Sequence, residues 1–76
     1  MINPISFSNG ITRTPARLVV HRDTMNPKAF VLSWDFGDGT AIGTEGECSR
    51  KYFAREYQAR RYGREVYGER VYRANW

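Results

Sequence analysis

The segment AFVLSWDF, residues 29–36, alternates apolar and polar side chains more regularly than the rest of the chain. Successive side chains of a β-strand point to opposite faces, so this alternation predicts a strand with one apolar face. The residues expected to face the core are Phe30, Leu32, Trp34 and Phe36, and those expected to face outward are Val31, Ser33 and Asp35. We predict that this strand lies at the centre of a sheet.

Further strands are predicted on both sides of this segment. Residues 16–23 (ARLVVHRD) alternate in the same way, with Leu18 and Val20 on the apolar face. After the central segment, Gly37-Asp38-Gly39 is a turn sequence, and residues 40–43 (TAIG) can return as a short partner strand. Earlier in the chain, Asn9-Gly10 stands between two β-prone runs, which is typical of a tight hairpin.

A helix is predicted over residues 45–62. Thr44 and Glu47 have the spacing of a capping box, in which each side chain accepts from a free backbone N–H of the first turn. Gly63 is predicted to end this helix, because glycine readily adopts the left-handed conformation found at helix ends. After it we predict a final strand, or a small hairpin that turns at Gly68-Glu69.

These elements define an α+β fold in one domain, residues 1–76. The expected sheet is small and mostly antiparallel, with an N-terminal hairpin, two central strands and a C-terminal strand or hairpin. The helix at about 45–62 packs across it. A chain of 76 residues is near the lower limit for folding on one hydrophobic core, and its aromatic residues supply much of the area to be buried.

Positive charge is concentrated in the last part of the chain. Residues 48–76 contain eight basic and three acidic side chains, whereas residues 1–47 contain four and five. Most of the excess is arginine, which binds phosphate and carboxylate with paired donors and stacks on flat rings. This segment is therefore the candidate functional surface.

Tyrosine recurs every fifth position in the same segment, at residues 52, 57, 62, 67 and 72. On the predicted helix, Tyr52 and Tyr62 form a stripe that can rest on the sheet, whereas Phe53 and Tyr57 point away from it. Arginines flank this second aromatic face. The candidate binding residues are Arg50, Phe53, Tyr57, Arg60, Arg61, Arg64, Arg70 and Arg73.

This surface predicts an anionic ligand, either nucleic acid or a nucleoprotein or host protein complex that handles nucleic acid. Aromatic rings stack on bases and arginines neutralise phosphates, but the same residues also dominate protein interfaces. Small proteins without a catalytic set are typical of phage-encoded inhibitors of host machinery, of the anti-CRISPR kind. Three alternatives stay open: Phe53 and Tyr57 complete the core, the basic face has no partner, or the aromatics form a homodimer seam with arginines paired to Glu56, Glu65 and Glu69.

Residues 34–40 read WDFGDGT, which resembles the signature of PKD domains. That family is an immunoglobulin-like β-sandwich with the Trp on a core strand and Gly-Asp-Gly in the following turn. The resemblance implies a virion or surface structural module that self-associates, which is our alternative function. The chain departs from the family after the turn, where residues 47–62 are charged and favour a helix.

The sequence predicts no enzyme, cofactor or metal site. His21 is the only histidine and is expected on a strand surface, and Cys48 is expected in the helix stripe that meets the sheet. Asp35 and Asp38 lack the ligand spacing of a calcium loop. A lone cysteine and the absence of a signal peptide or long apolar segment predict a cytoplasmic protein without membrane contact, in the host cytoplasm if it is phage-encoded.

Overall fold

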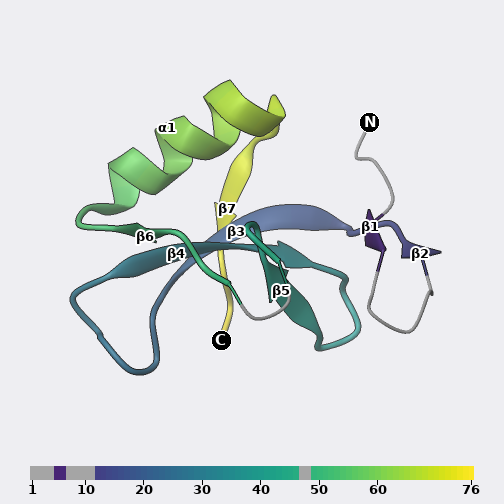
Figure 1. Cartoon of the computed structure of the whole chain (residues 1–76), viewed down its shortest axis with the longest axis horizontal. Coiled ribbons are helices and arrows are strands. Elements are labelled where there is room, and N and C mark those ends of the chain that lie inside the picture. Colours follow the sequence, from purple (N-terminus) through teal and green to yellow (C-terminus); the bar gives the residue numbers. More distant parts are fainter. Residues whose placement is uncertain (1–4, 7–11, 47–48) are drawn as a thin grey trace.

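The structure is a computed structural model that describes residues 5–6, 12–46 and 49–76, with side chains described for 14–46 and 49–76. Within these ranges the chain forms one helix and seven short strands (Figure 1). In chain order they are β1 (Ile5–Ser6), β2 (Thr12–Arg13), β3 (Arg17–Arg22), β4 (Phe30–Asp35), β5 (Ala41–Gly43), β6 (Tyr52–Phe53), α1 (Glu56–Tyr67) and β7 (Val71–Arg73).

Five of the strands form a mixed sheet with β4 at its centre, which confirms the predicted α+β fold. β3 pairs with one side of β4, and β5 and β6 pair with successive parts of the other side. These pairs are all antiparallel. β7 adds to the outer side of β3 in parallel, with Leu18 opposite Val71. The predicted partner strand after the turn and the predicted final strand are both present.

The N-terminal strands β1 and β2 pair antiparallel with Ile5 opposite Arg13, but they form a separate two-stranded sheet rather than joining the main one. The predicted turn at Asn9-Gly10 lies outside the described residues.

The helix α1 covers one face of the main sheet (Figure 1). The buried residues of this core are Leu18, Val20, Leu32, Trp34, Ala59 and Val71. The first four were predicted to face inward. Of the other two residues predicted to do so, Phe30 is half-buried and packs against this core, whereas Phe36 is half-buried and lies outside the cluster. Trp34 meets Tyr67 edge to face, with ring centroids 5.2 Å apart. Two aromatic rings from different elements therefore close the core at the end of the helix.

The predicted helix boundaries, 45–62, are wrong, since α1 runs from Glu56 to Tyr67. Thr44 and Glu45 instead form a turn that ends in a bridge between Gly43 and Gly46. Downstream, β6 extends the sheet and places Phe53 opposite Phe30. Burial of Phe53 against the sheet outweighs the local helix signal, which is worth about 1 kcal/mol. Glu47, the other half of the predicted capping box, and Cys48 lie outside the described residues.

The role predicted for Gly63 is also wrong. It lies inside α1 and is buried against the sheet, and the helix ends at Gly68, which adopts the left-handed φ of 66°. The N–H of Gly68 donates to the carbonyl of Arg64, as in an ordinary left-handed helix end. A Cβ built on Gly63 would come within 2.5 Å of Val71 Cγ2 and 2.8 Å of Leu18 Cδ2. Glycine at 63 therefore allows the helix to approach the sheet closely.

The face of the sheet opposite α1 is more buried than the alternation predicts. Val31, Ser33 and Asp35, expected to face outward, are all buried. The Asp35 carboxylate lies 3.5 Å from Arg17 Nε and accepts the Gly37 N–H at 2.9 Å. The central strand is thus buried on both faces.

No helix in the described part of the chain is long and apolar enough to cross a membrane.

Candidate nucleic-acid interface

The outer face of α1 presents Tyr57, Arg61 and Arg64, which we call the outer helix face. Ala59 and Gly63 point to the sheet, and residues at positions i, i+4 and i+7 on the opposite side share a common direction. Tyr57 is 60 % exposed, and both arginines are exposed. An aromatic ring and two guanidinium groups therefore project together into solvent.

A groove adjoins this face where α1 ends and β7 begins. It has a volume of about 470 Å³, and we call it the arginine groove. Its lining residues are Arg60, Arg64, Gly68, Glu69, Arg70 and Val71. Three guanidinium groups and one carboxylate line it, so its lining carries a net positive charge.

Two of the predicted arginines hold the fold together. Arg60 donates from Nε to Glu56 at 2.9 Å and from Nη1 to the carbonyl of Val71 at 2.7 Å. Arg73 donates to the same carboxylate at 3.1 Å. Glu56 therefore ties the start of α1 to the end of β7.

Three other arginines are not neutralised in this way. No carboxylate in the described ranges forms an ion pair with Arg61, Arg64 or Arg70. The guanidinium of Arg70 lies over the ring of Tyr72 at 5.2 Å, and Arg17 lies 5.5 Å from the same ring. Cation–π contacts leave the N–H groups of a guanidinium available for phosphate.

The remaining two predicted residues lie elsewhere. Phe53 is half-buried on β6 and packs against Tyr62 with ring centroids 5.3 Å apart, so it belongs to the core and shares no face with Tyr57. Arg50 donates to the buried carboxylate of Asp23 at 3.0 Å. The structure thus brings together Tyr57, Arg60, Arg61, Arg64 and Arg70, and it places Arg73 at the far end of β7.

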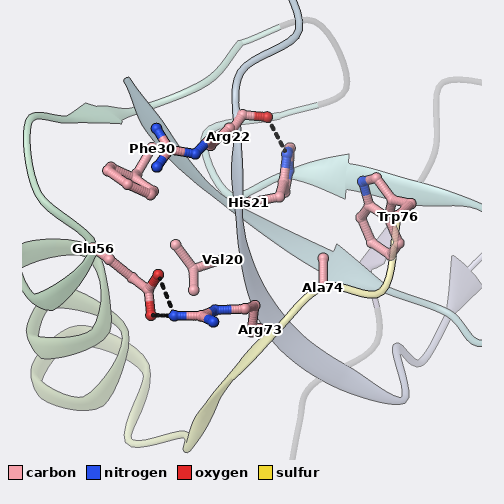
Figure 2. A pocket seen from close by; sticks show the side chains of 8 residues that line it. All are labelled: Val20, His21, Arg22, Phe30, Glu56, Arg73, Ala74 and Trp76. Atoms are coloured by element: carbon pink, nitrogen blue, oxygen red, sulfur yellow. Dashed lines mark hydrogen bonds and ion pairs between the residues drawn. The ribbon is translucent and has the colours of Figure 1, made fainter. Parts of the chain in front are cut away.

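A second hollow, missed by sequence reasoning, lies near Arg73 (Figure 2). It has a volume of about 360 Å³, and we call it the ring pocket. Its lining residues are Val20, His21, Arg22, Phe30, Glu56, Arg73, Ala74 and Trp76. No sequence pattern indicates this pocket, because its lining residues come from separate parts of the chain.

Both ring nitrogens of His21 lie within hydrogen-bond distance of a partner. Nδ1 lies 3.1 Å from the carbonyl of Arg22, which only accepts, so Nδ1 donates. Nε2 lies 2.7 Å from Ser33 Oγ on the neighbouring strand. The imidazole in turn contacts the indole of Trp76, with centroids 5.5 Å apart. In the described ranges no group of three or more His, Cys, Asp or Glu side chains is arranged to hold a metal ion.

Among the ionisable groups that the structure describes, Glu56 and Tyr62 have shifted pKa values. The hydrogen bond from Arg60, aided by Arg73, lowers the pKa of Glu56 below its ordinary value of 4.5. Burial raises the pKa of Tyr62, and the nearby Tyr67 and Glu45 act in the same direction. Tyr62 therefore remains a neutral hydrogen-bond donor at physiological pH.

The lowered pKa of Glu56 predicts an acid-dependent stability. A carboxylate with a lowered folded-state pKa stabilises the fold above its unfolded-state pKa, and this stabilisation is lost as the pH falls through the folded-state value. We expect the Glu56→Gln variant to lose less stability than the wild type between pH 7 and pH 3, measured by urea unfolding. Glu65→Gln, an exposed helix position, is the control, and equal slopes in wild type and Glu56→Gln would contradict the prediction.

Comparison of the chain with family models, with curated proteins and with solved structures finds no match in any of the three. The resemblance of WDFGDGT to PKD domains therefore stays a prediction. In the structure this segment is the end of β4 and a turn in which Gly37 and Gly39 have positive φ.

Proposed function

We propose that the protein is a non-enzymatic module that binds nucleic acid through the outer helix face and the arginine groove. One observation carries the proposal: Arg61, Arg64 and Arg70 are free of carboxylate partners among the described residues and lie beside the exposed ring of Tyr57 or in the groove. Unpaired arginines that converge on one surface suit the closely spaced phosphates of a nucleic acid backbone.

The test is a fluorescence anisotropy titration of labelled single- and double-stranded oligonucleotides at about 50 and 200 mM salt. Each phosphate contact with a single strand contributes about −0.7 to the slope of log affinity against log salt. Three contacts give a slope of about −2, so this fourfold rise in salt weakens binding roughly 20-fold. We expect the triple variant Arg61→Gln/Arg64→Gln/Arg70→Gln to weaken binding and to flatten the slope by about 2.

A matched pair of variants separates a local site from general charge. Arg64→Gln and Lys28→Gln each remove one positive charge from an exposed residue, but Lys28 lies in the loop between β3 and β4. We expect only Arg64→Gln to weaken binding. An equal effect of both variants would show that attraction to net charge, rather than this surface, causes the binding.

No binding at the lower salt would contradict the proposal. The same surface would then be an interface with a protein, either a nucleic-acid-handling complex such as an inhibitor of host machinery would contact, or a second copy of this chain. Sedimentation analysis over a range of concentrations separates these two cases, because self-association alone depends on the concentration of this chain. In the proposed role the protein acts where nucleic acid is accessible, in the cytoplasm.

A further inference from the structure

Three aromatic rings from separate parts of the fold line the ring pocket. His21 comes from β3, Phe30 from β4, and Trp76 from the segment that follows β7. Figure 2 shows Phe30 and Arg22 on one side of the hollow and Trp76 on the other, with Val20 and Ala74 between them. The pocket therefore has ring surfaces at its sides and small apolar side chains between them, as flat aromatic ligands require.

The indole of Trp76 is both held and exposed. It contacts His21, which is itself fixed by Ser33 and by the carbonyl of Arg22, yet 62 % of Trp76 is exposed. A large ring that is oriented by a neighbour and left in water can stack on a second ring at little cost in conformational entropy.

The rim of the pocket is positively charged. Arg22 lies over Phe30 at 4.9 Å and donates to the carbonyl of Pro27, and Arg73 is held by Glu56. The lining thus carries the guanidinium groups of Arg22 and Arg73 and one carboxylate, Glu56, which is also paired with Arg60. The charge favours a ligand that carries negative groups next to its aromatic part.

The strand β7 connects this pocket with the arginine groove. The groove is lined by Arg70 and Val71, and the pocket by Arg73, Ala74 and Trp76. β7 is an edge strand of the main sheet, since among the described strands it pairs only with β3. Ala74 follows the last residue of β7 and lies three residue steps from Val71. Three steps of extended chain span about 10 Å, which equals the rise of roughly three stacked nucleotides.

We propose that a single-stranded nucleic acid runs along β7, with its phosphates in the arginine groove and one unstacked base in the ring pocket against Trp76. This inference rests on the proposed function and specifies its ligand. A duplex keeps its bases paired and stacked, so it can bind through the phosphates but offers no base to the pocket without the cost of flipping one out.

The fluorescence of Trp76 tests the inference directly. The chain has two tryptophans, and Trp34 is only 8 % exposed, so a ligand in solution quenches mainly Trp76. The probes are an unlabelled single-stranded 12-mer, the duplex of the same sequence and inorganic polyphosphate, each titrated at about 50 mM salt. We expect the single strand to quench the fluorescence strongly, and the duplex and polyphosphate to leave it nearly unchanged.

Variants of Trp76 separate the signal from the affinity. Stacking of one base on an aromatic side chain corresponds to a change in affinity of about 5- to 150-fold. We expect Trp76→Ala to weaken single-strand binding within this range, while Trp76→Phe keeps most of the affinity and loses the signal. Met25→Ala, at another exposed apolar residue, is the matched control and should bind as the wild type does.

The outcomes distinguish this inference from the proposed function. If anisotropy detects single-strand binding while the Trp76 fluorescence is constant and Trp76→Ala binds normally, the ring pocket takes no base and the proposed function stands. Equal quenching by polyphosphate would also overturn the inference, because phosphate alone would then explain the signal. If no oligonucleotide binds, both the proposed function and the inference fail.

Discussion

Replacement of Gly63 by valine is expected to lower the free energy of unfolding by about 3 kcal/mol, near the upper end of the cost of overpacking a core. A Cβ at this position would meet Val71 and Leu18, both of which are buried. The helix would have to move away from the sheet to accept the new side chain, and neighbouring core contacts would be lost. Urea unfolding followed by circular dichroism measures the change.

The Gly63→Ala variant is the stricter test, because its expected effect on stability has the opposite sign to that of the same replacement in an exposed helix. In an exposed helix, glycine to alanine stabilises by about 1 kcal/mol. Here we expect a loss of about 1 kcal/mol, because overpacking costs about 1–3 kcal/mol and outweighs the gain in helix propensity. Glu65→Ala, at an exposed position of the same helix, should change stability by less than about 0.5 kcal/mol. A stabilised Gly63→Ala variant would contradict the close approach of α1 to the sheet.

Replacement of Arg50 by glutamine is expected to destabilise the fold by about 2 kcal/mol and to leave oligonucleotide binding unchanged. Asp23 is buried, and its carboxylate accepts from Arg50 Nη1 at 3.0 Å and from the backbone N–H of Asn26 at 2.9 Å. Removal of one partner from a fully buried pair costs about 3–5 kcal/mol. The cost is smaller here because 45 % of the Arg50 side chain is exposed and water can reach the carboxylate.

A double-mutant cycle checks the cause of this loss. The variant Asp23→Asn/Arg50→Gln should lose less stability than the sum of the two single variants, because it leaves no unpaired carboxylate. The opposite pattern, normal stability with binding weakened as much as by Arg64→Gln, would restore Arg50 as a binding residue.

The sequence predicted those elements of the fold whose signals are local. The alternation in residues 29–36 identified β4, and the glycines at 37 and 39 identified the turn before β5. The predicted helix boundaries were wrong because the two residues taken as signals of the helix ends have other roles in the fold. Thr44 lies in a turn, and Gly63 is required by a close contact with Leu18 and Val71, residues distant in the chain. The presence of a glycine alone does not distinguish the end of a helix from a site of close packing against a sheet.

The candidate site shows the same contrast between positions set by local spacing and positions set by long-range contacts. Tyr57 and Arg61 share a face of α1 because of their helical spacing, which is readable from the sequence. Arg64 joins this face only because α1 continues to Tyr67, past the predicted end at residue 62. The positions of Phe53 and Arg50 depend on pairing with β4 and with Asp23, which the sequence does not specify. The ring pocket is assembled from three strand ends and the start of α1, and no sequence pattern links His21, Phe30 and Trp76.

The parallel pairing of β7 with β3 has a consequence for the order of folding. β3, β4 and β5 follow one another in the chain and pair antiparallel, so their loops are short and close quickly. β4, β5, β6 and α1 all lie between β3 and β7 in the chain, so this pairing has the greatest sequence separation in the sheet. The edge strand that joins the arginine groove to the ring pocket is therefore expected to dock late, and a ligand bound along it would slow the first opening step of the native state.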